Sequence, residues 1–489
     1  MGLFTQIFQF ILSISILVIL HELGHFIPAK LFKTRAEKFF LFFDPVFSIF
    51  SMKNINGKWQ YRFLSKNLPD TETIIQDDGK EKKVPIDLSK LPEDDWRRYP
   101  ESTKYGIGWL PFGGYVKIAG MIDESMDIEQ MKKPAEPWEF RSKPAWQRLI
   151  IMLGGVTVNF FLAWFIYSCL SFFYGETYHD NSKFQNGIFA TEAAQKMGLK
   201  TGDKIIAIDG KPSVKMEHSL INMLFANNIT VIRNGQEITF RINEDGVAEV
   251  LKSNKAKIYF TARFPAVVDS VLPNFGAKEA GLEKGDKIIS VNGISTPFYD
   301  DLESLLASHK GKTIAIDIER NNEILHKDIR VNSEGKLGFF PSATVIEKAF
   351  DQTKVVKKYS LLEAIPRGFS RTIDALVMQV KQFKIIFNQK TQGYKKVSGP
   401  IGIVKMMPEQ INWELFWSFT AMFSIWLAFL NLLPIPGLDG GHVMFTLWEM
   451  ITGKPVPQKV LENAQMIGVI LLMGLMLLII GGDIFKLFK

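Results

Sequence analysis

The residues with the clearest chemical potential lie at the end of an apolar stretch. His21, Glu22 and His25 form an HExxH motif directly after residues 1–20, which carry no charged side chain. Residues four positions apart share one face of a helix, so the two histidines can hold one zinc ion. Glu22 is placed to take a proton from a water that the metal activates. The motif predicts a zinc-dependent hydrolytic site, and a satisfied polar cluster without metal is the alternative.

A catalytic zinc ion needs a third protein ligand and an open position for water. Asp439 is the favoured candidate, in the segment Asn431-Leu-Leu-Pro-Ile-Pro-Gly-Leu-Asp-Gly-Gly-His442. Two prolines break the helix there, and broken backbone at membrane depth is tolerated only where it lines protein or a wet cavity. A carboxylate at that break needs a partner, which zinc would supply. His442 is the rival ligand, and Glu37 and Asp44 are weaker candidates because they lie outside the membrane.

Four charge-free stretches must position these residues: 1–20, 149–175, 415–438 and 463–482. Each has about the length that a helix needs to cross the hydrocarbon core of a bilayer. Buried helices of a large soluble core are the alternative, but four such runs in one chain are unusual. The first run lacks a basic start and a small-residue cleavage site, which favours a retained helix over a signal peptide.

Composition narrows the class of protein. The chain has 489 residues, of which 47% are hydrophobic, and this apolar content excludes disorder over most of its length. Cys169 is the only cysteine, which excludes a disulfide-stabilised scaffold. The net charge of +7 fits contact with the anionic headgroups of a lipid bilayer. No nucleic-acid motif is present, and we expect no nucleic-acid partner.

Basic residues near the apolar stretches predict the orientation in the membrane. They gather on one side, which we assign to the cytoplasm: Lys30, Lys33, Arg35 and Lys38 after the first stretch, Arg141, Lys143 and Arg148 before the second, and Lys454 and Lys459 between the third and fourth. Residues 176 to about 412 then face outward. Five lysines between 381 and 396 oppose this assignment, although the rule is weaker for long loops.

The outer part contains a repeat. Residues 198–210 (GLKTGDKIIAIDG) and 281–293 (GLEKGDKIISVNG) are identical at eight of thirteen positions. Two tandem domains follow from this, and the shared motif resembles the core of a PDZ domain. PDZ domains bind extended peptide ends by adding a strand to a sheet edge, so peptides are candidate partners. The alternative is a pair of spacers that shield the membrane part.

The loop between the first two apolar stretches has two distinct parts. Residues 70–101 are acidic and read as an exposed insertion. Gly113 and Gly114, flanked by alternating apolar residues, predict a β-hairpin at about 105–119 that sits at the membrane interface. Further along the chain, residues 359–388 have the pattern of an amphipathic helix or a linker helix.

Taken together, the HELGH sequence, FGGYVK, the paired repeats, VSGPIGI at 397–403 and NLLPIPGLDGG resemble the site-two protease family of intramembrane metalloproteases. The resemblance covers nearly the whole chain. It implies that His21, His25 and Asp439 bind Zn²⁺, that Glu22 is the catalytic base, that Asn431 positions substrate or stabilises the transition state, and that Gly113, Gly114, Tyr115 and Val116 present the substrate as an added strand. Two departures stand out: residues 154–159 lack the proline of the family's GPxxN motif, and the insertion is long.

The predicted fold is a multi-pass α-helical membrane protein with four transmembrane helices, two tandem PDZ-like α+β domains and a membrane-associated β-hairpin. Its segments are helix one (1–29), a cytoplasmic-side loop (30–147), helix two (148–175), the PDZ-like domains (178–262 and 263–340), linker helices (355–411), helix three (412–438) and helix four (462–485). The resemblance implies cleavage of single-pass membrane proteins, trimmed beforehand, such as an anti-sigma factor. It places the protein in the bacterial inner membrane with the PDZ-like domains on the periplasmic side. The alternatives are a general clearance protease for remnant signal peptides and a catalytically dead PDZ-bearing scaffold.

Overall fold

The computed structural model describes residues 2–68, 71–75, 81–121, 134–252, 259–389 and 393–487. Parts of the insertion expected at 70–101 lie outside these residues, as does Lys390, one of the five lysines that oppose the predicted orientation. The chain divides into two compact units. The membrane unit comprises Met1–Tyr174, Tyr359–Val380 and Val397–Lys489. The second unit comprises Gly175–Lys358 and Lys381–Lys396 and is called the outer unit after the side that the sequence predicts for it.

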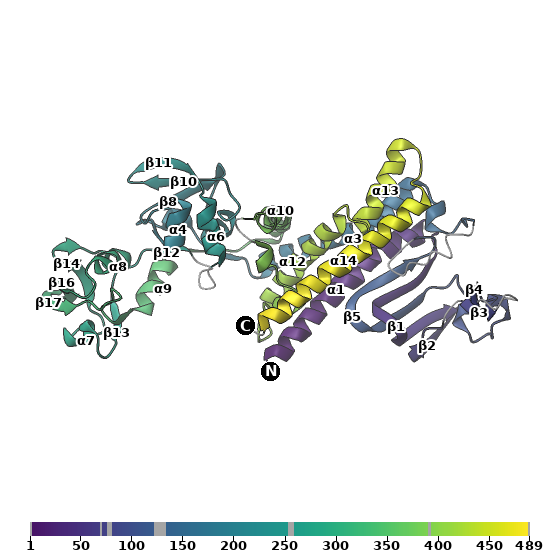
Figure 1. Cartoon of the computed structure of the whole chain (residues 1–489), viewed down its shortest axis with the longest axis horizontal. Coiled ribbons are helices and arrows are strands. Elements are labelled where there is room, and N and C mark those ends of the chain that lie inside the picture. The colour runs from purple at the N-terminus through teal and green to yellow at the C-terminus, as the bar shows by residue number, and fades with distance from the viewer. Residues whose placement is uncertain are drawn as a thin grey trace. The chain divides into compact units, whose positions relative to one another are not determined.

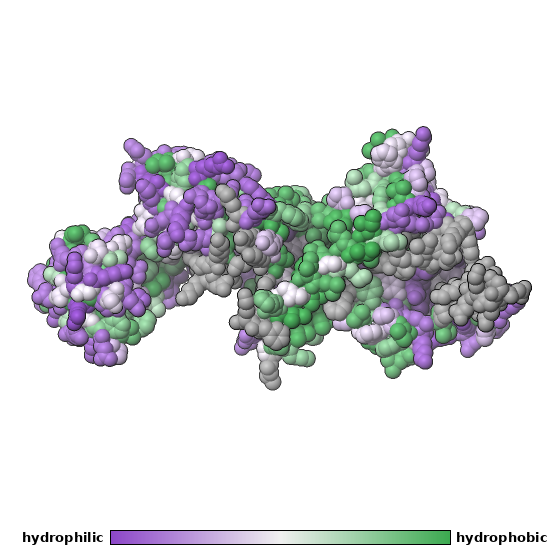
Figure 2. Space-filling view, in the orientation of Figure 1, coloured by the Kyte–Doolittle hydropathy of each residue, from purple (hydrophilic) through white to green (hydrophobic). Residues whose placement is uncertain are grey.

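Four helices in the described part of the membrane unit are long and apolar enough to cross a bilayer (Figure 1). They are α1 (Gly2–Leu31), α3 (Ala145–Phe173), α12 (Trp413–Leu432) and α14 (Gln458–Leu487). Each contains most of one charge-free stretch of the sequence. Figure 2 shows a largely hydrophobic surface over this helical part, as expected of side chains that face lipid.

Helix α3 packs against both α1 and α12. The α1–α3 crossing is made of glycines: a Cβ on Gly154 would lie 1.8 Å from the Gly24 carbonyl oxygen, and a Cβ on Gly24 would lie 2.4 Å from the Gly154 oxygen. The two backbones are therefore in direct contact, which only glycine permits, and small residues at such crossings are typical of membrane helices. This contact brings the HExxH turn of α1 against α3.

The third apolar stretch breaks after Leu432. Helix α13 (Asp439–Thr452) then begins at the aspartate of the motif. Pro434 and Pro436 lie in the break, where they cannot donate the backbone hydrogen bonds of a continuing helix. The break is anchored to α14, because Gln465 Oε1 accepts a hydrogen bond of 3.1 Å from the backbone N–H of Gly437. The sequence predicted one helix with a broken end, and the structure forms two helices joined by a turn.

A three-stranded sheet in the order β2-β1-β5 follows α1. Its strands are β1 (Ala36–Ile55), β2 (Lys58–Lys66) and β5 (Lys104–Ile118). The expected hairpin at 105–119 is instead one bent strand, because both arms of β5 pair with β1: Leu41 lies opposite Gly114 in one arm and Ile107 in the other. Gly113, with φ +92°, lies in the bend. Local alternation predicted the strands correctly but could not predict which neighbour each arm would pair with.

The remaining elements of the membrane unit are short or peripheral. They are β3 (Thr71–Ile75), β4 (Glu81–Pro85), η1 (Leu88–Lys90) and η2 (Trp96–Arg98) in the insertion, η3 (Phe140–Ser142) before α3, and α11 (Pro400–Val404) before α12. Helix α10 (Leu361–Ile386) begins in the membrane unit and ends in the outer unit. Within the insertion, β3 and β4 pair antiparallel, and the Trp96 side chain is buried.

The outer unit contains two four-stranded sheets of the same strand order, β11-β10-β8-β9 and β17-β16-β14-β15. The first consists of β8 (Lys204–Ile208), β9 (Lys211–Pro212), β10 (Asn228–Arg233) and β11 (Gln236–Arg241), with helices α4 (Glu192–Met197), α5 (Met216–Asn222) and α6 (Glu244–Lys252). The second consists of β14 (Lys287–Val291), β15 (Ile294–Ser295), β16 (Thr313–Arg320) and β17 (Glu323–Arg330), with α7 (Gly276–Glu279), α8 (Tyr299–Ser308) and α9 (Ala343–Asp351). Paired short strands complete the unit: β6 (Glu176–His179) with β19 (Lys354–Lys357), β7 (Ile188–Ala190) with β12 (Phe260–Ala262), and β13 (Val268–Val271) with β18 (Phe339–Pro341). Two short 3-10 turns, η4 (Asn181–Lys183) and η5 (Gly393–Lys396), also belong to it.

Each repeat contains an equivalent ion pair between an arginine and a buried aspartate. In the first, Arg233 Nε lies 2.7 Å from a carboxylate oxygen of Asp203, which is fully buried. In the second, Arg320 Nε lies 2.6 Å from Asp286, which is 1% exposed. Both aspartates belong to the repeated GD of the sequence, and both arginines end the third strand of their sheet in chain order. A buried carboxylate requires such a partner, which explains why the repeat contains this residue pair.

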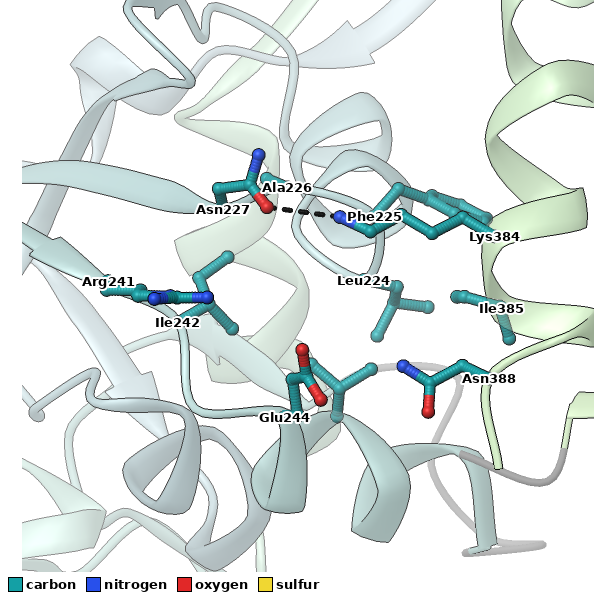
Figure 3. Close-up of a pocket in the computed structure, with 11 residues that line it drawn as sticks. Leu224, Phe225, Ala226, Asn227, Arg241, Ile242, Glu244, Lys384, Ile385 and Asn388 are labelled. Atoms are coloured by element: carbon teal, nitrogen blue, oxygen red, sulfur yellow. Dashed lines mark hydrogen bonds between the residues drawn. The ribbon is translucent and has the colours of Figure 1, made fainter. Parts of the chain in front are cut away.

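A small pocket of about 40 Å³ lies beside the first repeat (Figure 3). Lys384, near the end of α10, reaches into it and donates a hydrogen bond of 3.0 Å to Asn227 Oδ1. Lys384 is one of the lysines that oppose the predicted orientation. Its ammonium group binds the first repeat, so its charge has a structural partner within the outer unit.

Candidate metal centre and active site

Among the described residues, one group of side chains is close enough to hold a metal ion: His21, His25 and Asp439. Asp439 Oδ2 lies 3.3 Å from His21 Nε2 and 3.2 Å from His25 Nε2, and the two Nε2 atoms are 3.2 Å apart. A tetrahedral zinc ion with bonds of about 2.0 Å separates its ligands by about 3.3 Å. The three atoms therefore have the spacing of three corners of a zinc site.

The environment of these atoms also fits zinc. Within the described part of the chain, Asp439 Oδ2 is buried with no neighbouring donor other than the two histidine rings. A buried carboxylate in this position is costly unless a cation binds it. His25 Nδ1–H donates to the backbone oxygen of Ile151 at 2.8 Å. That bond places the hydrogen on Nδ1 and leaves the lone pair of Nε2 for a metal.

Asn159, on α3, supports the second histidine. Its side-chain amide nitrogen lies 2.9 Å from His21 Nδ1, and its amide oxygen is buried without a hydrogen-bond partner among the residues that the structure describes. Turning the amide by 180° exchanges the two atoms. The oxygen then accepts the hydrogen of Nδ1, and His21 Nε2 also keeps its lone pair for a metal. Sequence reasoning assigned Asn159 no role.

Gly155 lies one turn before Asn159 and is a second residue that sequence reasoning missed. A Cβ there would lie 2.4 Å from His25 Nε2 and 2.6 Å from His21 Cε1. Both imidazoles therefore rest against bare backbone of α3. The signal available in the sequence was the four-residue spacing from Gly155 to Asn159, which puts both on one face of the helix.

The cluster opens into a cavity of about 200 Å³ in the membrane unit. Every site residue predicted from the sequence lines this cavity: His21, Glu22, His25, Gly113, Gly114, Tyr115, Val116, Asn431 and Asp439. The Glu22 carboxylate forms a hydrogen bond with the backbone of Val116. Asn431 Nδ2 lies 3.2 Å from His21 Nε2. The structure thus brings together a possible base, three ligand atoms, an amide donor and a strand.

The other candidates for a third ligand are placed elsewhere. Glu37 pairs with Lys117, whose Nζ lies 3.1 Å from its carboxylate. Asp44 accepts a hydrogen bond of 2.7 Å from the Tyr115 hydroxyl. His442 lines the cavity but is not part of the three-residue cluster. Of the four candidates, Asp439 alone lies beside both histidines.

An HExxH pair in a membrane-spanning helix, joined by a carboxylate from a broken membrane segment, defines a membrane-embedded metallopeptidase. The model of Peptidase family M50 matches residues 9–65 and 94–475, and the chain belongs to this family. It is a zinc metalloprotease of the site-two type. The match leaves out residues 66–93, which include most of the insertion expected at 70–101.

Curated relatives match the chain from end to end. The regulator of sigma E protease of Haemophilus influenzae is 26% identical, with 98% of each chain covered. The regulator of sigma-E protease RseP of Escherichia coli K12 is also 26% identical, again over 98% of each chain. A relative from Clostridium perfringens that is named as a zinc metalloprotease is 26% identical over 97% of each. The similarity therefore includes both the membrane unit and the outer unit.

Proposed function

We propose that this protein cleaves the transmembrane segments of single-pass membrane proteins, with His21, His25 and Asp439 as zinc ligands and Glu22 as catalytic base. The convergence of these residues in one cavity of the membrane unit carries the proposal. Ionisable residues at membrane depth are costly and are kept for function. An intact ligand set also argues against a catalytically dead scaffold.

The chemistry assigns a separate task to each group. Bound zinc would polarise the scissile carbonyl and acidify a water molecule. Glu22 accepts the proton of that water as it attacks the peptide carbonyl and then donates a proton to the leaving amine. The Asn431 amide, beside His21, is placed to donate a hydrogen bond to the carbonyl oxygen as negative charge develops there.

The strand at 113–116 is proposed to receive the substrate. A transmembrane helix satisfies its carbonyls internally, so it must unwind before a nucleophile can reach one. The freed backbone groups would be costly in lipid. Strand β5 is at the end of its sheet and lines the cavity, and an edge strand can pair with an unwound segment.

Glu22→Gln tests the chemistry. This change keeps the size of the side chain and the ligand set but removes the base. We expect a trimmed single-pass reporter to be cut by the wild type and by the control Glu414→Gln, an exposed residue at the start of α12. Glu22→Gln should retain zinc and lose cleavage. Equal cleavage by wild type and Glu22→Gln would refute the proposed role of Glu22.

Disulfide trapping tests the strand. Cys169 is the only cysteine, so Cys169→Ala provides a cysteine-free background. Val116→Cys, combined with Glu22→Gln to prevent turnover, is paired with single cysteines scanned along the reporter segment. An added strand predicts cross-links at every second position, whereas a substrate that stays helical predicts a spacing of three or four. The helical spacing would remove the proposal that β5 receives an unwound substrate.

The paired repeats of the outer unit are proposed to be PDZ-like domains that gate access. By size they can exclude substrates with large outer domains, so that another cut must come first. We propose an anti-sigma factor as substrate, in keeping with the names of the relatives, and a bacterial inner membrane with the repeats on the periplasmic side. A protease for remnant signal peptides would instead cleave many unrelated segments, and a panel of reporters distinguishes the two.

A further inference from the structure

Asp44 is a buried acid that the zinc chemistry does not use. The residue is 6% exposed, and its carboxylate accepts three side-chain hydrogen bonds. Tyr115 Oη donates at 2.7 Å to Oδ1, and Asn67 Nδ2 and Ser48 Oγ donate at 2.8 Å and 3.0 Å to Oδ2. A buried carboxylate is tolerated when it is paired in this way. The network joins two strands of the sheet to the segment that follows the third.

Lys104 supplies the opposite charge and contacts Asp44 indirectly, through shared hydrogen-bonding partners. Its Nζ donates to Asn67 Oδ1 at 3.1 Å and to Ser48 Oγ at 3.5 Å, the same two residues that bind Asp44. It lies 5.4 Å from the ring centre of Phe40. The cation and the carboxylate therefore share two hydrogen-bonding partners without touching.

The surroundings of Lys104 make its charge depend on Asp44. Burial, together with the positive charges of Lys38, Arg62 and Lys53, lowers the pKa of Lys104 to about 8, and the Asp44 carboxylate opposes that shift. Among the groups facing Lys104 that act on its pKa, Asp44 is the one acid. Loss of the Asp44 charge would leave a partly buried cation without compensation, which is unfavourable.

Tyr115 connects this network to the active site. Its ring stacks on Phe40 and Phe43, with ring centres 5.7 Å and 5.8 Å away. Stacking fixes the plane of the ring, and the bond to Asp44 fixes its position within that plane. Tyr115 lines the cavity of the zinc site, two residues after the bend at Gly113.

We propose that Asp44 is a positioning residue for the proteolytic reaction. Through the Tyr115 hydroxyl it holds the strand edge at 113–116 in register with the site, while Lys104 balances its charge. This proposal rests on the proposed function, in which that edge receives the unwound substrate. Among the described residues, the side chain of Asp44 forms its hydrogen bonds with Tyr115, Asn67 and Ser48 and not with the candidate zinc ligands, so its loss should alter substrate handling and leave zinc binding intact.

The test uses the full-length protein in proteoliposomes with a trimmed single-pass reporter. Tyr115→Phe removes one oxygen, and Asp44→Asn removes the charge. Each should lower kcat/KM about tenfold, the size expected for losing a hydrogen bond to a charged group. The double variant should be no worse than the more affected single variant, because both changes break one contact. Tyr61→Phe, an exposed tyrosine of the same sheet, is the matched control and should behave as the wild type.

Three readouts separate positioning from general damage. Zinc content should stay at the wild-type value in every variant. The kcat/KM of the wild type should fall as pH rises through about 8, where Lys104 loses its proton. Lys104→Met should abolish this pH dependence. Its kcat/KM should stay, at every pH between 7 and 9, at the low value that the wild type reaches above about pH 8.

Several outcomes would overturn the proposal. An unchanged kcat/KM in Tyr115→Phe would overturn it. Because this variant removes a single oxygen atom, a loss of activity in it would not be the result of misfolding. Additive losses in the double variant, or parallel loss of zinc, would indicate a general structural role. The disulfide scan at Val116 distinguishes failure of the Asp44 proposal from failure of the proposed function. A two-residue spacing with normal Tyr115→Phe kinetics removes only the role of Asp44. A helical spacing removes the role of the strand itself.

Discussion

Gly155→Ala offers a direct test of how the metal centre is built. The added methyl group would lie 2.4 Å from His25 Nε2 and 2.6 Å from His21 Cε1, whereas ordinary contact begins near 3.4 Å. One imidazole, or α3 itself, must move by about 1 Å. Neither can move freely, because His25 forms a hydrogen bond with the backbone of Ile151 on α3, and the backbones of α1 and α3 are already in contact where the helices cross. The strain therefore falls on the ligand atoms.

The size of the effect follows from this displacement. A shift of about 1 Å at a reacting centre costs about 100-fold in rate, equivalent to about 2.7 kcal/mol. Disturbing the residues that support metal ligands costs about 10-fold to 100-fold in metal affinity. We expect Gly155→Ala to lose cleavage by about 100-fold and to release zinc to a competing chelator at a correspondingly lower chelator concentration.

The assay compares Gly155→Ala with Gly474→Ala. Gly474 lies in another membrane-spanning helix, α14, and an added Cβ there meets nothing within 4 Å. Both variants place one methyl group in the membrane unit, so a general effect on insertion would appear in both. Wild-type cleavage with full zinc affinity in Gly155→Ala would refute the proposed ligand geometry. Equal loss in both variants would show that the glycine contact is not the cause.

Other predictions concern the support of the site and the outer unit. Asn159→Leu should lower zinc affinity about 10-fold to 100-fold in a chelator competition, and Asn159→Asp, which keeps an acceptor for His21, should lose less. Burial alone would raise the pKa of Asp286, but Arg320, together with the backbone N–H of Glu283 and the charge of Lys327, lowers the pKa below its usual 3.8. The second repeat should therefore keep this stabilisation above about pH 4 and lose it in more acid solution, and Arg320→Met should shift acid unfolding, followed by limited proteolysis, to higher pH. Deleting residues 180–335 should permit cleavage of an untrimmed reporter, and continued rejection would contradict gating by the repeats.

The sequence predicted those parts of the site that depend on local spacing. The HExxH interval places His21 and His25 on one helical face whatever surrounds them. The prolines before Asp439 predict a break in a membrane segment, and a break there needs polar partners. Both inferences use interactions within a few residues. The meeting of the two segments depends on tertiary packing. It was predicted because the Asp439 carboxylate at the break needs a partner, and the resemblance to a known family implied the same ligand set.

The features that the sequence did not predict depend on contacts between distant segments. Gly155 and Asn159 acquire their roles only because α1 crosses α3 at Gly24 and Gly154. The two arms of β5 pair with β1 instead of with each other, because β1 bends and provides a neighbour for each arm. Alternating hydrophobicity has the same pattern in both arrangements. Pairing partners are therefore the information that a local pattern lacks.

Helix α3 provides none of the three candidate ligands, yet it determines how two of them are presented. It receives the Nδ1 hydrogen of His25 at Ile151, contacts His21 through Asn159, and leaves room for both rings at Gly155. Zinc affinity should therefore be more sensitive to changes on this face of α3 than to changes of equal size on its lipid-facing side, where Phe161 and Phe165 are exposed. A protease that works within a membrane must keep a polar cluster ordered where water cannot compensate for a lost hydrogen bond. A rigid helix packed backbone to backbone against the ligand helix meets that requirement, because neither imidazole can turn without breaking a bond to it.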